Sequence, residues 1–329
     1  MSRKLLHIRL LRHGTVLTGG ARFEEFLIDN LAKALIERSV SVKTDRKIFN
    51  RLYRGFAHIT LLWEGFYHSR ADVNIVTLRL GLPSILRNLF SQNKTVIVLH
   101  NFDYNDGKKF YLKVYSKILF RVLRSNPARV CVICVSPYFR NFFQEEFKNL
   151  PVYKVPNLFR TENYRIANLK KDPKKILLGQ YVSKNDPSVY DLAKMLSQKG
   201  YYCFFLTLDP ELVSKHEYFD IKCVSFEEYL VEMASSYCSV ALTGVNEGWP
   251  RMVHESILVG TPVIGYAKGG LGDLLRESDS YIVNSAEEAF ELITKGEVTY
   301  RTSISFIEKY DVSHAVEFLE PVIKFILSE

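Results

Sequence analysis

The stretch from Asn246 to Gly265 reads NEGWPRMVHESILVGTPVIG and combines a loop, a start signal for a helix and an apolar run. It follows CSVALTG, an apolar run typical of a buried strand. Pro250 suits the first turn of a helix, because its missing N–H would have no partner there. The pattern therefore predicts a helix from about Pro250 to Val259, ended by Gly260, and then a second buried strand in TPVIGYA.

Similar short β-rich runs alternate with helical stretches along the whole chain. The first half contains LLHIRLLR, VSVKT, HITLLW, VNIVTL, TVIVLH and VCVICVS, and the second half contains KKILLGQ, YCFFLTL, IKCVSF, CSVALTG, TPVIGYA and SYIVN. Strands separated by helices of about ten residues or more predict parallel sheets with crossover helices. The fold class is therefore α/β, with two facing Rossmann-like doubly wound domains and the ligand cleft expected between them.

A cluster of prolines and lysines in PVYKVPNLFRTENYRIANLKKDPKK interrupts this alternation and marks the domain boundary. We expect an acceptor-side domain over residues 1–160 and a donor domain over residues 161–305. Residues 306–329 are expected to form a C-terminal helix that packs back towards the first domain.

Composition describes a globular chain. It has 329 residues, of which 47% are hydrophobic, and this suffices for two cores at about 150 residues per domain. No window approaches the roughly 18 apolar residues of a spanning helix, and the basic residues in MSRKLLHIRLLRHG are unlike a secretory signal. The five cysteines are an odd number, and CVIC lies inside a strand-like run, which favours reduced core cysteines over a redox or zinc site. We expect a cytoplasmic protein, with the inner face of the plasma membrane as a second possible location.

Charge is distributed unevenly between the two halves. Residues 1–160 contain 27 Lys and Arg against 11 Asp and Glu, whereas residues 161–329 contain 17 against 25. A strongly basic first half favours a polyanionic partner, such as an anionic membrane surface, a phosphorylated substrate or a nucleic acid.

The predicted helix after Pro250 offers an anion site. Its first N–H groups, on Arg251, Met252 and Val253, have no partner within the helix, and the helix dipole adds partial positive charge. Glu255 lies one turn further along, and Glu247 lies on the loop before the helix. Two carboxylates that flank a phosphate cradle suit a diphosphate with a hydroxyl-rich ring at each end, because carboxylates accept strong hydrogen bonds from diols. A nucleotide-sugar has this shape.

These motifs resemble the retaining glycosyltransferases of the GT-B fold, in particular glycosyltransferase family 4. The family's donor signature looks like EGFPN or EGFG with a second glutamate inside it, then G-x-PVI and GG, and this chain has EGWP, Glu255, GTPVIG and Gly269-Gly270. The resemblance extends to VSPYFRNFF, VPNLF, KILLGQYVSK and LTGGARFEEFLIDNLAKAL.

The resemblance implies roles for individual positions of the donor domain. Glu255 matches the residue expected on the ribose hydroxyls, and Glu247 matches the one expected on the transferred sugar. Gly248 and Trp249 would offer backbone N–H groups to that sugar, and Lys184 matches a lysine expected on the diphosphate.

The first domain also contains matching positions. His100 matches a histidine that faces the sugar, and Gly19-Gly20 match a loop that closes over the reaction centre. A structural hydrogen bond at the end of a strand is the alternative interpretation of His100.

Two positions depart from the family pattern. The family usually has an arginine where this chain has Gln180, so one positive charge is missing at the leaving diphosphate, and Arg251 or Lys268 could replace it. The strand YCFFLTLDPEL also lacks a glycine-containing turn common in relatives, which leaves the nucleotide base open.

The implied reaction is transfer of a hexose-type sugar from a UDP- or GDP-type donor to an acceptor hydroxyl, with retention of configuration. Family resemblance implies that no metal or further cofactor takes part, and that catalysis is mainly positioning and stabilisation of leaving-group charge. Glu247 is accordingly not a nucleophile.

The sequence pattern of residues 108–125 predicts a cationic amphipathic helix. Lys109, Lys113, Lys117 and Arg121 recur every four residues, and the remaining positions are largely apolar. Such a helix either lies on an anionic membrane or packs its apolar face on the sheet. The basic first half favours membrane contact, and with it a saccharide or lipid-linked saccharide acceptor in cell-surface polysaccharide or glycolipid biosynthesis.

Two other functions fit the same sequence. The enzyme could act on a soluble sugar, a protein or a nucleic acid, although the aromatic residues fit one helix stripe better than the exposed stacking platforms of a nucleic-acid site. The chain could also be an inactive sugar-nucleotide-binding or scaffolding subunit of a transferase complex, for which Gln180 is the main indication.

Overall fold

The computed structural model describes residues 5–13, 19–49, 63, 65–100, 110–125, 127–166, 169–180, 185–207 and 209–328. The chain divides into two compact units. The first combines Met1–Asn157 with Ser313–Glu329, and the second is Leu158–Val312.

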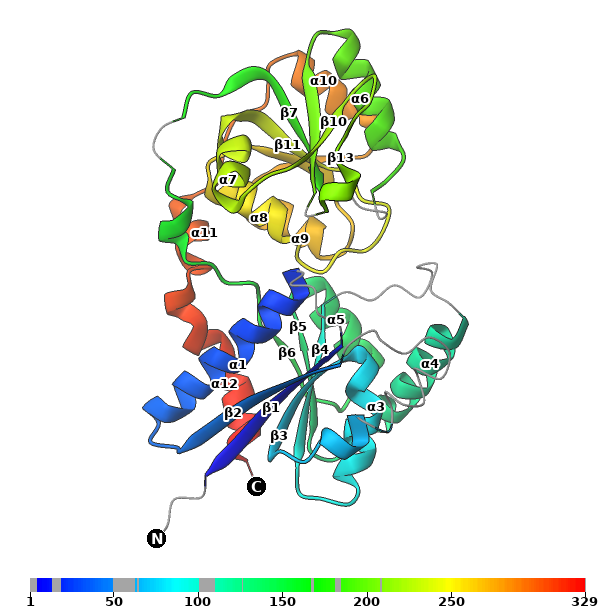
Figure 1. Ribbon diagram of the computed structural model, residues 1–329, viewed down its shortest axis with the longest axis vertical. Helices are drawn as coiled ribbons and strands as arrows, with labels where there is room; N and C mark the ends of the chain where they lie inside the picture. The colour runs from blue at the N-terminus through cyan, green and yellow to red at the C-terminus, as the bar shows by residue number, and fades with distance from the viewer. Residues whose placement is uncertain are drawn as a thin grey trace. The chain divides into compact units, whose positions relative to one another are not determined.

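The first unit is built on a six-stranded parallel sheet with the order β2-β1-β3-β4-β5-β6 (Figure 1). Its strands are β1 (Leu6–His13), β2 (Val42–Phe49), β3 (Val73–Thr77), β4 (Lys94–Leu99), β5 (Val130–Cys134) and β6 (Val152–Lys154). Its main helices are α1 (Gly19–Glu37), α3 (Leu78–Asn88), α4 (Phe110–Arg124), α5 (Pro137–Glu146) and α12 (Ala315–Leu327). The predicted strand HITLLW lies outside the described residues except for Trp63, which is helical.

The inner strands of this sheet are buried on both faces, which explains their continuous apolar runs. All five residues of β5 are buried, including Cys131 and Cys134, and both cysteines are free thiols. Burial raises the pKa of the Cys134 thiol to about 12, so this thiol stays protonated near neutral pH. The prediction that the two cysteines are core residues is confirmed.

The C-terminal helix α12 belongs to the first unit although the whole second unit precedes it. Figure 1 shows α12 beside α1. The ammonium group of Lys94, at the start of β4, donates to the carbonyl oxygens of Phe325 at 2.7 Å and Ile326 at 3.0 Å. These carbonyls lie in the last turn of α12, where the helix itself provides no donors, so Lys94 attaches the end of the chain to the sheet.

Helix α4 packs its apolar side on the sheet, with Leu119, Phe120 and Leu123 fully buried. Its outer side carries exposed Lys117 and Arg121. Val114 and Ile118 are also 38% and 48% exposed. No helix in the described part of the chain is long and apolar enough to cross a bilayer.

The second unit contains a seven-stranded sheet with the order β13-β12-β11-β7-β8-β10-β9. Its strands are β7 (Asp172–Gln180), β8 (Tyr202–Thr207), β9 (Ser214–Lys215), β10 (Asp220–Cys223), β11 (Ser236–Ala241), β12 (Val263–Tyr266) and β13 (Tyr281–Val283). All neighbouring pairs are parallel except β9, which pairs antiparallel with β10 at the sheet edge. Two parallel α/β sheets confirm the predicted fold class.

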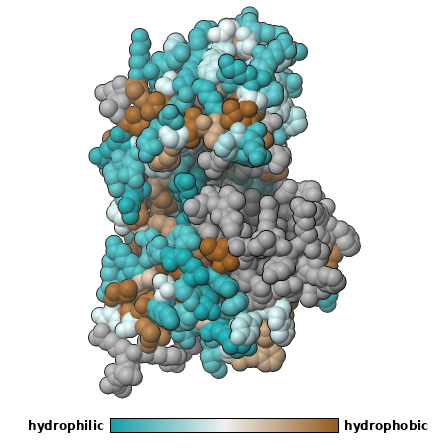
Figure 2. Space-filling view, in the orientation of Figure 1, coloured by the Kyte–Doolittle hydropathy of each residue, from teal (hydrophilic) through white to brown (hydrophobic). Residues whose placement is uncertain are grey.

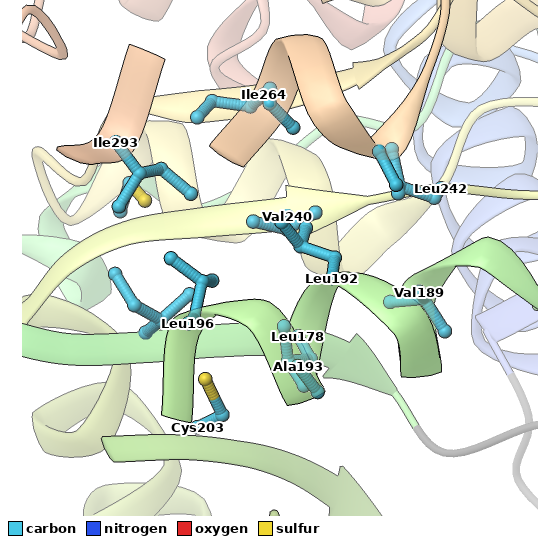
Figure 3. Packing of buried hydrophobic residues seen from close by; sticks show 14 of the residues in the cluster. Leu178, Val189, Leu192, Ala193, Leu196, Cys203, Val240, Leu242, Ile264 and Ile293 are labelled. Carbon is cyan, nitrogen blue, oxygen red and sulfur yellow. The ribbon is translucent and has the colours of Figure 1, made fainter. Parts of the chain in front are cut away.

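The helices of the second unit are α6 (Ser188–Gln198), α7 (Phe226–Ser235), α8 (Arg251–Leu258), α9 (Gly269–Glu277), α10 (Ala286–Thr294) and α11 (Ile304–Lys309). Figure 3 shows how α6 contributes to the core, with Leu192 next to Val240 of β11 and Leu196 on the same side of the helix. On the face shown in Figure 2 the described residues are mainly hydrophilic, as expected when the apolar side chains fill such cores.

Candidate functional site

Residues 236–258 form the predicted strand, loop and helix. Strand β11 ends at Ala241, Pro250 is the N-cap of α8, and the helix ends at Leu258. Gly260 follows with a φ of +79°, a left-handed conformation that favours glycine. The first turn of α8 consists of Arg251, Met252 and Val253, as predicted.

The loop before α8, residues 242–250, is joined to the start of α9 through Glu247. The backbone N–H of Gly270 donates to the Glu247 carbonyl at 2.7 Å. Gly269 has a φ of +57°, and a Cβ there would lie 2.7 Å from the same carbonyl oxygen. Only glycine therefore fits at position 269. The Gly269-Gly270 pair of the donor signature thus lies against the backbone of Glu247.

Glu255 is buried in a polar network that the sequence did not reveal. The Tyr164 hydroxyl donates to its Oε1 at 3.2 Å, and the Tyr229 hydroxyl donates to its Oε2 at 2.7 Å. Arg251 also donates to Oε1, at 3.0 Å. These donors come from three elements, the 3-10 turn η1 (Thr161–Tyr164), α7 and α8, and together they fix the orientation of the carboxylate.

This network limits what Glu255 can still accept. Burial, and then the negative charge of Glu255, raise the pKa of Tyr229, so its hydroxyl remains a donor. A carboxylate offers about four acceptor positions, and three are used by the tyrosines and Arg251. A diol that binds at Glu255 must therefore use the remaining position or displace a tyrosine hydroxyl.

Gln180 ends β7 beside an irregularity in the strand. The pairing of β7 with β8 shifts register between Leu177 and Gln180, and Gly179 between them has a φ of +89°. A Cβ at Gly179 would lie 3.1 Å from the carbonyl oxygen of Val240. The side-chain amide of Asn185 donates to the Gln180 carbonyl at 3.0 Å. Lys184 lies outside the described residues.

The two cations considered as replacements for the missing arginine have different environments. The Arg251 guanidinium binds Glu255 and lies 4.5 Å from the centre of the Phe159 ring. The Lys268 ammonium lies 3.7 Å from Asp186, and the lysine side chain is 40% exposed. Arg251 is thus held by two partners, whereas Lys268 makes a longer and more solvated ion pair.

Trp249 points into the interior of the second unit rather than to its surface. Its indole N–H donates to Nδ1 of His254 at 2.9 Å, and both side chains are buried. Because an indole can only donate, Nδ1 must be unprotonated and the His254 proton sits on Nε2. The Trp249 side chain is thus held inside the unit by His254, and the backbone role expected for Gly248 and Trp249 stays a prediction.

Aromatic rings surround His254 on several sides. The ring centres of Phe159, Phe306 and Tyr310 lie 4.5, 5.2 and 5.1 Å from that of His254. Burial, and then the positive charge of Arg251, lower the pKa of His254 to about 3. We refer to His254, Trp249, Phe159, Phe306 and Tyr310 as the aromatic cage. Sequence reasoning missed it, because Phe159 and Phe306 are far from the motif along the chain.

The first unit contains the other predicted site residues. His100 directly follows β4 and its side chain is 26% exposed. Gly19 and Gly20, which the resemblance places in a loop that closes over the reaction centre, are the first residues of α1 in the structure. This helix also carries Glu24, whose carboxylate lies 3.1 Å from Nε2 of His100 and which sequence reasoning did not select.

Comparison with known proteins gives matches by structure only. No protein-family model matches the chain, and no curated protein matches it by sequence. A sucrose-phosphate synthase from Thermosynechococcus elongatus superposes with a TM-score of 0.71 at 14% identity, covering 96% of this chain and 98% of that chain. AviGT4, a glycosyltransferase involved in avilamycin A biosynthesis, gives 0.59 at 14% identity, covering 98% and 99%.

A third similar structure is that of Anabaena HepE in complex with UDP and glucose. It gives a TM-score of 0.60 at 14% identity and covers 96% of both chains. These likenesses extend over nearly the whole length of each protein. The chain has the GT-B glycosyltransferase fold.

Proposed function

We propose that this protein is a retaining, metal-independent hexosyltransferase that uses a nucleotide-diphosphate sugar, similar to glycosyltransferase family 4. The observation that carries the proposal is the arrangement around α8. Glu255 is oriented by three donors one turn into this helix, and Glu247 is fixed to the start of α9 by its backbone. An oriented carboxylate one turn into a helix, with a second glutamate held by its backbone just before that helix, suits a diphosphate that carries a ribose and a sugar.

A UDP-type donor is the first choice within this proposal. Its support is the likeness to HepE, whose structure was determined with UDP and glucose. Glu255 would receive a ribose hydroxyl and Glu247 a hydroxyl of the transferred sugar. The N–H groups of Arg251, Met252 and Val253 would face the diphosphate from the first turn of α8.

Leaving-group charge must be stabilised for the transfer to proceed. Lys184 and Lys268 are the cations that we assign to the diphosphate. Lys268 is preferred over Arg251 as the replacement for the missing arginine at position 180, because Arg251 already binds Glu255 and stacks on Phe159. His100 is assigned a hydrogen bond to the transferred sugar.

The acceptor is proposed to be a saccharide or a lipid-linked saccharide, in polysaccharide or glycolipid biosynthesis at the cell surface. The basic first half supports contact with the anionic inner face of the plasma membrane. Lys117 and Arg121 remain exposed on α4 beside Val114 and Ile118, so the outer side of this helix is the proposed contact. Flotation with anionic and neutral liposomes tests it, and failure to bind anionic vesicles at low salt contradicts it.

A calorimetric screen against UDP, GDP, ADP and their common sugar conjugates tests the donor assignment. We expect one nucleotide class to bind, and Glu255→Ala to weaken binding at least tenfold because the oriented carboxylate is lost. The control is Glu228→Ala on α7, whose carboxylate only caps its own helix. Binding of no nucleotide, or equal binding by Glu255→Ala, contradicts the proposal. If no nucleotide binds, the absence of an arginine at position 180, where the chain has Gln180, would favour a scaffolding subunit.

A further inference from the structure

The buried carboxylate of Glu24 has no evident role in stabilising the first unit. Glu24 is 3% exposed and lies on the inner side of α1. Its Oε1 contacts His100, whereas its Oε2 is buried without a hydrogen-bond partner among the described residues. Leaving a buried acceptor unsatisfied costs about 1–3 kcal/mol, and more when the group is charged. A carboxylate at this position therefore needs a reason other than stability.

The neighbouring Glu25 shows the ordinary environment of a glutamate on this helix. It faces outwards and forms an ion pair with Arg46 of β2. Two adjacent residues of the same type thus have different partners, one at the surface and one inside. This makes Glu25 a matched control for Glu24.

The ring of His100 is fixed by two residues of α1. Phe23 is buried and meets the imidazole edge to face, with ring centres 5.1 Å apart and an angle of 86° between the planes. Glu24 binds Nε2 at 3.1 Å. Within the part of the chain that the structure describes, Nδ1 is the ring nitrogen that remains for another partner. Because ligands of parallel α/β sheets bind at the carboxyl ends of the strands, a residue directly after β4 is well placed to use it.

We propose that Glu24 is a positioning residue that keeps the His100 proton on Nε2, so that Nδ1 acts as a hydrogen-bond acceptor; the identity of its ligand rests on the function proposed above. An ionised carboxylate can only accept, so the nitrogen that faces it must carry the proton. In the neutral imidazole the other nitrogen then has a free lone pair. A carboxylate behind a functional histidine commonly fixes its tautomer in this way.

The fixed tautomer specifies the chemical class of the group that His100 contacts. A lone pair on Nδ1 accepts from a hydroxyl, whereas a phosphate or a carboxylate offers only acceptors and would oppose it. His100 therefore recognises a neutral sugar hydroxyl. A nucleotide-sugar whose sugar has a carboxylate, or no hydroxyl, at the position that faces Nδ1 loses this hydrogen bond. Glu24 thus determines sugar specificity through His100.

Nitrogen-15 NMR of the histidine side chains tests the proposal without using activity. The chain contains eight histidines, and the signals of His100 are identified by their absence in His100→Asn. We expect wild type and Glu25→Gln to show a single Nε2–H form of His100. Glu24→Gln should show a mixture or the other tautomer, because an amide can donate or accept. An unchanged tautomer in a folded Glu24→Gln variant would overturn the proposal.

Transfer kinetics add a second readout once a donor is known. We expect Glu24→Gln to lower kcat about 10- to 100-fold with nucleotide affinity unchanged, as for other residues that orient a functional group. The same loss in Glu25→Gln, or none in Glu24→Gln, contradicts the inference. The two proposals fail separately: an inactive wild type whose tautomer responds to Glu24→Gln refutes only the transferase, and an active wild type whose tautomer does not respond refutes only the inference.

Discussion

His100 and His254 are one residue type in two opposite environments. His100 follows a strand, is 26% exposed in its side chain and has a carboxylate against one nitrogen. His254 lies inside a helix, is fully buried and receives an indole N–H. The partner therefore determines the tautomer in each case, because a carboxylate faces a protonated nitrogen and an indole faces an unprotonated one. We infer that His254 stabilises the loop at residues 242–250, whereas His100 is the histidine that we propose for a ligand.

The largest effect on stability is expected for His254→Ala. The substitution empties the centre of the aromatic cage and leaves the Trp249 N–H without its acceptor, at a cost of about 3 kcal/mol or more in the free energy of unfolding. Urea denaturation measures it. His216→Ala is the control in the same unit, because His216 is exposed and should cost less than about 0.5 kcal/mol. Similar losses in both variants would remove the distinction between the two histidines.

His100→Ala is expected to act on turnover instead. Loss of a positioned hydrogen-bonding group should lower kcat about 100-fold, equivalent to about 2.7 kcal/mol of transition-state stabilisation. The free energy of unfolding should fall by about 1–2 kcal/mol, less than for His254→Ala, because the buried Glu24 loses its partner while the His100 side chain itself is partly exposed. His314→Ala, an exposed histidine paired with Glu317, is the control. A stability loss as large as that of His254→Ala would mean that His100 is a structural residue.

Acid sensitivity, measured over a single pH unit, gives the smallest of the three effects. The pKa of His254 is about 3 in the folded protein against an ordinary value near 6.5, so the unfolded state takes up a proton first. Its contribution to stability is complete above pH 6.5 and is lost as the pH falls towards 3. The slope approaches about 1.4 kcal/mol per pH unit.

His254→Phe separates the contribution of His254 to the pH dependence of stability from that of other groups, since phenylalanine fills the cage but does not titrate. We expect the variant to be less stable than wild type at pH 7, because Trp249 loses its acceptor. The difference between the two proteins should shrink by about 1 kcal/mol between pH 6 and pH 5. Parallel stability curves for wild type and His254→Phe would show that His254 is not held neutral.

The fold was predictable because its determinants are local. Alternating apolar runs and helices identify the parallel sheets, and Pro250 and Gly260 locate both ends of α8. The antiparallel edge strand β9 was missed, because it has only two residues. The cations that recur every four residues on α4 were visible in the sequence. The side of the helix that packs on the sheet was not, and the structure shows that it is the side with Leu119 and Leu123.

The candidate site was predictable only in its local part. Glu247 and Glu255 lie within one motif, so spacing was enough to select them. The partners of the candidate site residues come from distant segments. Tyr164 is 91 positions from Glu255, and Glu24 is 76 positions from His100. Contacts of this kind depend on how strands are ordered in the sheet, and no spacing rule in a single sequence reveals them.

The configuration of the sugar that the protein releases shows whether it is a retaining transferase. Proton NMR should follow hydrolysis of the donor selected by the calorimetric screen, without acceptor, in wild type and His100→Ala. A retaining transferase predicts that wild type first releases the anomer present in the donor, and that His100→Ala releases it about 100-fold more slowly. First release of the opposite anomer, or no release by wild type at all, would contradict the account.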